Sequence, residues 1–271
     1  MQKKEIVLTL GLLAEKGACN QGIRKFKRWY PNGSAPLSEV LRKLQEIANT
    51  SADYVEYVEY AKWLVDNFPP TQETLVLNEL TEKVIIHNGD VTINCDIDGD
   101  RIIIGNGDLN IEGGANLTGW VEIQAKNVKG QNITLYDCAT IWAGAIDTIN
   151  IAAYDDAEIG VKTMAATNIA AYGDAKISSG TIDTQNIVAY DYAGIFVEET
   201  IDTINIAAYD YAGIFVEETI DTINIAAYDQ SEIWAKKINV QNIMDDSRWG
   251  IHGKINLIQP SSNQQNTNTA S

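Results

Sequence analysis

The sequence predicts a mainly β fold: a parallel β-helix (solenoid) with coils of 18 or 19 residues, preceded by a small α-helical N-terminal domain. Three observations support it: a short block recurs at a fixed spacing, apolar residues alternate with polar ones inside each period, and residues 1–80 follow a helical periodicity instead. Helical repeats are about 33 residues or longer, so a period of this size favours one coil of a β-helix.

The recurring block is Asn-Ile-x-Ala-Tyr-Asp or a close variant, and its spacing is 18 or 19 residues throughout. Copies begin at Asn132, Asn150, Asn168, Asn186, Asn205 and Asn224, with a degenerate copy at Asn242. Residues 189–210 are identical to residues 208–229. Such identity indicates tandem duplication of one 19-residue unit.

Alternation within a coil indicates which side chains fill the interior, because successive side chains of a strand point to opposite faces. In the coil that begins near Asn205, a third short segment, 219–221, returns the chain to the next coil. The predicted inward residues of this coil are Ile204, Ile206, Ala208, Ala212, Ile214 and Val216. The same phase extends upstream, where Ile123 corresponds to Ile141 one coil later.

We expect three segments: a helical domain at 1–80, the solenoid at 81–258 and a disordered polar tail at 259–271. In the first segment, Ser51 is predicted to cap a helix that Pro69-Pro70 terminates. The apolar stripe of that helix comprises Tyr54, Val58, Ala61, Leu64, Val65 and Phe68. An earlier helix carries Val40, Leu41, Leu44 and Ile47.

The formal charge of −17 is confined to the solenoid side of the chain. Residues 1–80 hold ten acidic and ten basic residues, including the basic cluster Arg24, Lys25, Lys27 and Arg28, whereas the remainder holds 27 and ten. An acidic rod repels nucleic acid and anionic membranes, so basic proteins or cations are the expected partners. Three widely spaced cysteines and the lack of a long apolar run favour a cytoplasmic protein without a membrane segment.

No pattern in the chain predicts a catalytic residue, a metal site or a cofactor. Aspartates recur at one coil position, and such a ladder is unsuited to holding an acid and a base with distinct pKa values. Asp245, Asp246 and Arg248 are interpreted as a C-terminal cap. The stretches 96–100 and 105–108 resemble fragments of calcium loops but are interpreted as turns. Threonines 148, 167, 184, 203 and 222 form a single file, without the paired spacing expected of an ice-binding face.

The N-terminal segment carries the only family resemblance. Residues 8–26, followed by Tyr30-Pro-Asn-Gly33, resemble a short module of bacteriophage and prophage proteins with the pattern "TL..L...GAC..G...F". Such modules often precede solenoid-type repeats, so the resemblance implies a phage origin. In shape and charge the acidic solenoid is also similar to pentapeptide-repeat proteins that imitate DNA. The five-residue period and central Leu or Phe of those proteins are absent.

Surface recognition is the function that these features favour. The predicted partner-binding residues are Asp191, Glu198, Glu199, Asp202, Asp210, Glu217, Glu218 and Asp221, with the outward aromatic column Trp142, Phe196, Phe215 and Trp234. We expect a non-enzymatic, phage-derived inhibitor that blocks a basic nucleic-acid-binding host protein through a DNA-like acidic surface. The alternatives are a structural or oligomer-forming solenoid, such as a virion or assembly component or a homodimer through the aromatic face, and a glycan-binding or glycan-cleaving β-helix.

Overall fold

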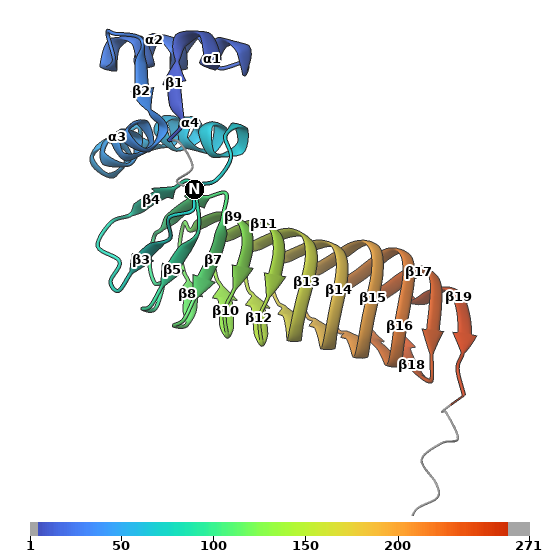
Figure 1. Ribbon diagram of the computed structural model, residues 1–271. Helices are drawn as coiled ribbons and strands as arrows, with labels where there is room; N and C mark the ends of the chain where they lie inside the picture. Colours follow the sequence, from blue (N-terminus) through green and yellow to red (C-terminus); the bar gives the residue numbers. More distant parts are fainter. Residues whose placement is uncertain (1–4, 260–271) are drawn as a thin grey trace, which may run out of the picture. The chain divides into compact units, whose positions relative to one another are not determined.

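The computed structural model describes residues 5–259, so the predicted disordered tail lies outside the described residues except for Gln259. The fold is the predicted one: a mainly β chain with a parallel solenoid of about ten coils of about 18 residues and a few N-terminal helices (Figure 1). Its contacts divide it into a first unit that ends at Asp147 and a second that begins at Thr148, and each is described separately.

The first unit begins with four helices and a short hairpin. The helices are α1 (Leu10–Glu15), α2 (Asn20–Trp29), α3 (Leu37–Thr50) and α4 (Tyr54–Asn67), and the antiparallel hairpin pairs β1 (Val7–Thr9) with β2 (Ser34–Pro36). The apolar stripes of α3 and α4 are buried as predicted, except that Ile47 and Tyr54 are only partly buried. Ser51 is not the N-cap of α4, because it ends α3 and its Oγ accepts the N–H of Asp53, the true N-cap.

The remaining strands of the first unit form parallel solenoid coils. They are β3 (Leu75–Leu77), β4 (Val84–His87), β5 (Val91–Ile93), β6 (Ile102–Gly105), β7 (Asp108–Ile111), β8 (Ala115–Leu117), β9 (Glu122–Lys129), β10 (Asn132–Leu135) and β11 (Thr140–Asp147). Strand β3 pairs in parallel with β5, so the solenoid ladder already includes residues 75–77. Ile123 and Ile141 lie in register, which confirms the predicted phase.

Helix α3 covers the exposed edge of the first coil in this unit. Asn49 donates from Nδ2 to the carbonyl of Val84 and accepts the Val84 N–H at Oδ1, both at 2.8 Å. The Ile86 N–H donates to Oε1 of Gln45 at 2.7 Å. A side-chain amide offers one donor and one acceptor, as a neighbouring strand would. Two amides of α3 therefore satisfy the strand edge that would otherwise be open to pairing.

The second unit consists of regular coils (Figure 1). Its strands are β12 (Asn150–Ala153), β13 (Glu158–Ala171), β14 (Lys176–Ala189), β15 (Gly194–Ala208), β16 (Gly213–Asp229), β17 (Glu232–Val240), β18 (Asn242–Ser247) and β19 (Gly250–Leu257). Identical positions of successive coils are in register, as with Ile195 and Ile214. Five of the six predicted inward residues are buried, but Ile204 is 42% exposed. Thr203 takes the inward place because two consecutive residues, Ile204 and Asn205, face outward at a corner.

The threonine file is an internal corner ladder. Thr203 is buried, and its hydroxyl lies within hydrogen-bond distance of the carbonyl of Gln185, one coil earlier, at 3.1 Å. Thr167 does not belong to this file, because Ala166 is the residue in register with Thr184. The buried hydroxyls thus satisfy backbone carbonyls where the coil turns.

Two further ladders stabilise the strand that carries the Asn-Ile-x-Ala-Tyr block. Asparagine side chains bond from Nδ2 to Oδ1 of the preceding coil at 2.7–2.8 Å, linking positions 150, 168, 186, 205, 224 and 242. Tyrosines 154, 172, 190, 209 and 228 stack with ring centroids 4.6–5.2 Å apart. These columns follow directly from the repeat, because every coil presents the same side chain at the same place.

Candidate functional site

The aspartate that ends each block occupies a backbone corner. Asp191 and Asp210 have φ of 59° and 57°, in the left-handed region, and Gly173 takes the same place one coil earlier with φ of 67°. Aspartate enters this region more readily than most residues. The carboxylate of Asp191 also accepts the Gly173 N–H at 3.3 Å. Two of the predicted partner-binding residues therefore have a structural role in the corner.

Replacement of Asp210 by valine is expected to destabilise the second unit by about 1–2 kcal/mol relative to replacement by glycine. Both substitutions remove the same charge, but only valine resists a positive φ. Urea unfolding followed by circular dichroism measures the difference. Equal stabilities of the two variants would show that the aspartate corner does not depend on backbone preference.

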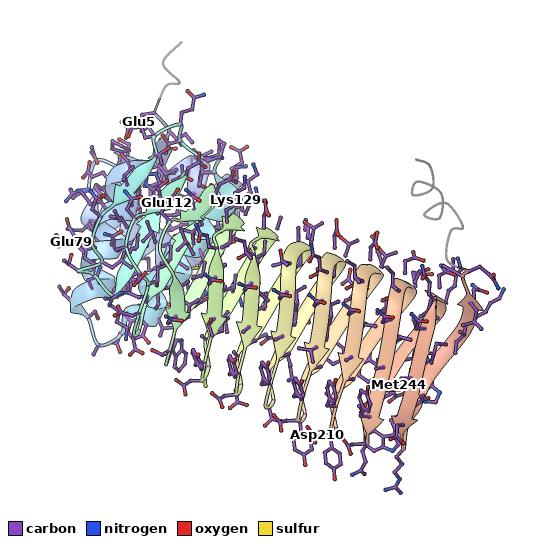
Figure 2. All side chains as sticks on the ribbon, turned by 90° about the horizontal axis from the view of Figure 1, so that it is seen from below. Glu5, Glu79, Glu112, Lys129, Asp210 and Met244 are labelled. Carbon is purple, nitrogen blue, oxygen red and sulfur yellow. The ribbon has the colours of Figure 1, made fainter. Side chains whose placement is uncertain are left out.

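Seven exposed carboxylates of the second unit form what we call the acidic ridge. They are Asp183, Glu198, Glu199, Asp202, Glu217, Glu218 and Asp221. Asp202 is in register with Asp183 in the preceding coil and with Asp221 in the following one. The ridge thus contains six of the eight predicted acidic residues, whereas Asp191 and Asp210 lie at the other corner of the same coils. Figure 2 shows Asp210 at that corner.

The extra residue of the 19-residue coils lies within the ridge. Between β14 and β15 the register shifts after Ser179, so that Thr181 aligns with Thr200 and the longer coil gains one residue at the Glu198–Glu199 corner. The register shifts back between β16 and β17. There Lys236 pairs with Glu218 at 2.6 Å, and Asn239 donates to Asp221. The glutamate pairs are thus confined to two coils, and a lysine bounds them on one side.

Three of the four predicted aromatic residues stand in one column beside the ridge. Phe196, Phe215 and Trp234 are in register, and the two phenylalanine rings stack at 5.5 Å. Trp142 belongs to the first unit, where it is in register with Gln124. Phe196 precedes Glu198 by two residues on the same outward side, so this column borders the ridge.

The phenylalanine rings also have a local packing role. A Cβ built on Gly213 would lie 2.3 Å from the ring of Phe215, which means that the ring covers the glycine backbone. One side of each ring is therefore used within the coil, and the other faces solvent: Phe196 is 42% exposed. Sequence reasoning missed Tyr192 and Tyr211, which stack at 4.9 Å and are 64% and 41% exposed. The sequence feature that could have predicted this pair is the Asp-Tyr dipeptide, which recurs at the corner of each duplicated coil.

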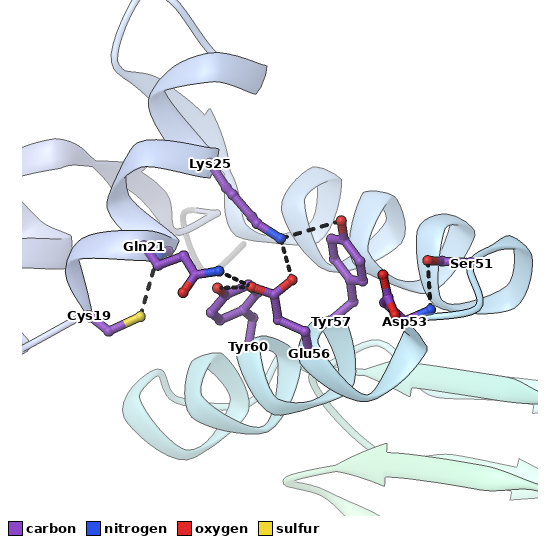
Figure 3. A network of polar contacts seen from close by, with 9 residues as sticks. Cys19, Gln21, Lys25, Ser51, Asp53, Glu56, Tyr57 and Tyr60 are labelled. Atoms are coloured by element: carbon purple, nitrogen blue, oxygen red, sulfur yellow. Dashed lines mark hydrogen bonds and ion pairs between the residues drawn. The ribbon is translucent and has the colours of Figure 1, made fainter.

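The basic cluster of the first unit divides into exposed residues and one that is used internally. Arg24, Lys27 and Arg28 are exposed, whereas Lys25 contacts Glu56 at 2.5 Å and the hydroxyl of Tyr57 at 3.3 Å (Figure 3). The hydrogen bond from Lys25 is the main reason that the pKa of Glu56 is lowered. Lys25 therefore joins α2 to α4.

This ion pair gives the helices a pH-dependent contribution to stability. Because the pKa of folded Glu56 lies below its ordinary value of 4.5, the contribution is complete above that pH and is lost as the pH falls through the folded pKa. We expect Glu56→Gln to cost at most about 1 kcal/mol at neutral pH, since the pair is partly solvated. Unfolding followed by tryptophan fluorescence at pH 7 and pH 3 should show that the variant's deficit shrinks in acid. A deficit that is independent of pH would contradict this role.

The N-terminal motif lines a cavity of about 350 Å³ among the helices. Its motif residues are Leu13, Gly17, Ala18, Cys19, Gly22 and Phe26, joined by Trp29 and Trp63 among others. Cys19 is the N-cap of α2, where its Sγ accepts the Gly22 N–H at 3.3 Å. The motif therefore shapes the wall of an apolar cavity, which sequence reasoning did not anticipate.

The aspartates of the calcium-like stretch bond to the backbone of later coils. Asp96 accepts the Gly114 N–H at 2.9 Å, and Asp100 accepts the Trp120 N–H at 3.1 Å. Within residues 5–259, no group of three or more His, Cys, Asp or Glu side chains is placed to hold a metal ion. No helix in this part of the chain is long and apolar enough to cross a membrane.

Comparison with known proteins finds no matching family model, no matching curated protein and no matching solved structure. The candidate site is therefore defined by geometry alone: the acidic ridge and the aromatic column beside it on the second unit.

Proposed function

We propose that the protein is a non-enzymatic inhibitor that occupies the nucleic-acid-binding groove of a basic partner with its acidic ridge. Charge density is the observation that carries this proposal. The ridge places seven exposed carboxylates on three consecutive coils. At ~4.8 Å per coil, three coils cover ~14 Å, over which duplex DNA carries about eight charges. A groove shaped for DNA would meet a similar density of negative charge.

The surroundings of the ridge support binding to a protein. Residues 148–258 hold 17 acidic and six basic residues, so long-range attraction would speed association with a basic partner. The aromatic column of Phe196, Phe215 and Trp234 borders the ridge, with Phe196 and Trp234 exposed and Phe215 half-buried. Aromatic residues are enriched at the centres of protein interfaces, where a few of them contribute much of the binding energy.

The resemblance of the N-terminal motif to phage modules favours a bacterial host protein as the target. A defence nuclease in the host cytoplasm would present the basic groove that this ridge fits. Direct binding of nucleic acid by the solenoid is disfavoured by its own negative charge.

The test uses the full chain as bait in a bacterial lysate, with duplex DNA as competitor. We expect wild type to capture a basic protein that DNA releases, and the variant E198Q/E199Q/E217Q/E218Q to lose it. A control with four neutralised carboxylates away from the ridge, E158Q/D156N/D174N/D246N, should retain it. Capture should also weaken steeply between low and physiological salt.

Two results would overturn the proposal. One is capture that persists in the ridge variant and resists DNA. The other is an equal loss of capture in the ridge variant and the control, which would mean that net charge, and not the position of the ridge, determines binding. Capture that salt does not weaken would favour a structural or oligomer-forming solenoid instead.

A further inference from the structure

The last coil of the second unit leaves its interior residues exposed. Val240 and Ile238 are fully buried, yet the residues in register with them one coil later, Leu257 and Ile255, are 73% and 41% exposed. Met244 is 56% exposed on the same coil (Figure 2). Leu257 and Ile255 continue columns that point into the solenoid, and they are exposed because no described residue covers them.

The backbone of this coil also presents an edge. Strand β18 is in register with β16, and β19 with β17, so each has its ladder partner in the preceding coil. The far side of both strands is a row of main-chain donors and acceptors open to pairing. In the first unit, by contrast, Asn49 and Gln45 satisfy the β4 part of the corresponding edge of the first coil.

Charge is balanced on the last coil, unlike on the ridge. Residues 242–258 contain Asp245 and Asp246 against Arg248 and Lys254. Asp245 stands in register with the buried Ala227, and its carboxylate accepts hydrogen bonds from Ser247 and from the Ile251 N–H within its own coil. Two such end faces can approach without the repulsion that two ridges would suffer.

We propose that this end face is an interface between two copies of the chain, paired through their last coils about a two-fold axis. Head-to-tail stacking is disfavoured because side chains of helix α3 already bond to the β4 edge of the first coil. The residues that follow, 260–271, are nearly all Ser, Asn, Gln and Thr, which are unsuited to covering apolar side chains. An isologous contact, in which the same edge pairs with itself in antiparallel fashion, closes both open edges at once.

The size of the end face sets the expected affinity of the dimer. It offers residues 242–258, slightly fewer than the roughly 20–30 residues that each partner contributes to a standard interface. A reversible dimer that forms at about micromolar concentration is therefore expected. This inference goes beyond the proposed function and does not depend on it, because no other protein is required.

Sedimentation of the purified full chain over a range of concentrations tests the proposal. We expect the mass to rise from the 29.8 kDa monomer toward a dimer, and the variant I255E/L257E to raise the dissociation constant at least tenfold. The matched control I149E/I223E places two glutamates at side chains that are 50% and 39% exposed, on the sides of the coils and outside both the ridge and the aromatic column. The control should dimerise like wild type.

A second measurement uses the unmodified protein. Hydrogen exchange of the amides in 242–258 should slow as protein concentration rises, because the strand edge becomes paired. A monomer at all concentrations overturns the inference. So does a dimer whose dissociation constant the end-face variant leaves unchanged, since the contact would then lie elsewhere on the chain.

Discussion

Deletion of residues 190–208 is expected to leave a folded solenoid with sharply reduced affinity for a basic partner. Residues 189–210 are repeated as 208–229, so the deletion joins Ala189 to Tyr209 and keeps the repeat pattern intact. Each coil contacts only its neighbours. Removal of one coil therefore removes the stability of that coil and of one coil–coil contact, and the remaining coils can still stack. Circular dichroism should retain its β spectrum.

The functional loss follows from the position of the deleted coil. It contains Glu198, Glu199 and Asp202, together with Phe196 from the aromatic column. The acidic ridge would fall from seven carboxylates to four. We expect binding of the protein captured in the lysate experiment to weaken at least about tenfold, or ~1.4 kcal/mol.

A second deletion provides the control. Loss of residues 154–171 joins Ala153 to Tyr172 and also removes one coil, but this coil contributes nothing to the ridge. This deletion should shorten the solenoid without lowering its affinity for the captured protein. Equal losses of affinity in the two deletions would mean that the length of the solenoid, and not the ridge, governs binding.

The sequence predicts the coils well because the repeat encodes them locally. A period of 18 or 19 residues with alternating side chains specifies the register of Ile195 with Ile214 without any knowledge of distant contacts. The errors lie at the corners. Ile204 faces outward because strict alternation fails where the chain turns between strands, and Thr167 lies one residue out of phase, since Ala166 is in register with Thr184. Corner geometry depends on backbone angles that a two-residue period does not carry.

The site was predicted in part for the same reason. The glutamate pairs recur in duplicated coils, so their clustering could be derived from spacing. Trp142 lies in the first unit, so the site described on the second unit does not include it. The role of Asp210 depends on a positive φ that composition does not reveal. The end face required knowledge of which coil is last in the described structure.

The covered edge of the first coil could not be predicted, because its contacts join residues 35 to 41 positions apart. Asn49 and Gln45 lie on a helix whose apolar stripe is evident in the sequence. In the sequence, however, a polar residue beside that stripe cannot be distinguished from one that only contacts solvent. Only the structure shows that these amides satisfy the backbone of β4.

The double variant Gln45→Leu and Asn49→Leu is expected to destabilise the first unit by about 2–5 kcal/mol, because three backbone groups of Val84 and Ile86 lose their partners. Leucine is similar in size to these amides, so packing is largely kept while the hydrogen bonds are lost. Urea unfolding followed by tryptophan fluorescence measures the change. Asn49→Asp, which keeps the acceptor for the Val84 N–H but not the donor, should lie between wild type and the double variant.

The same variant should also associate, since an uncovered parallel edge pairs readily with other strands. Light scattering that grows with protein concentration in the double variant, but not in Asn49→Asp, would show that the amides act as a strand substitute and not only as packing. If the double variant matches wild type in both stability and scattering, apolar packing of α3 on Val84 and Ile86 alone holds the edge. That result would also remove the argument against head-to-tail stacking, and the end face of the last coil could then pair with the first coil of another copy.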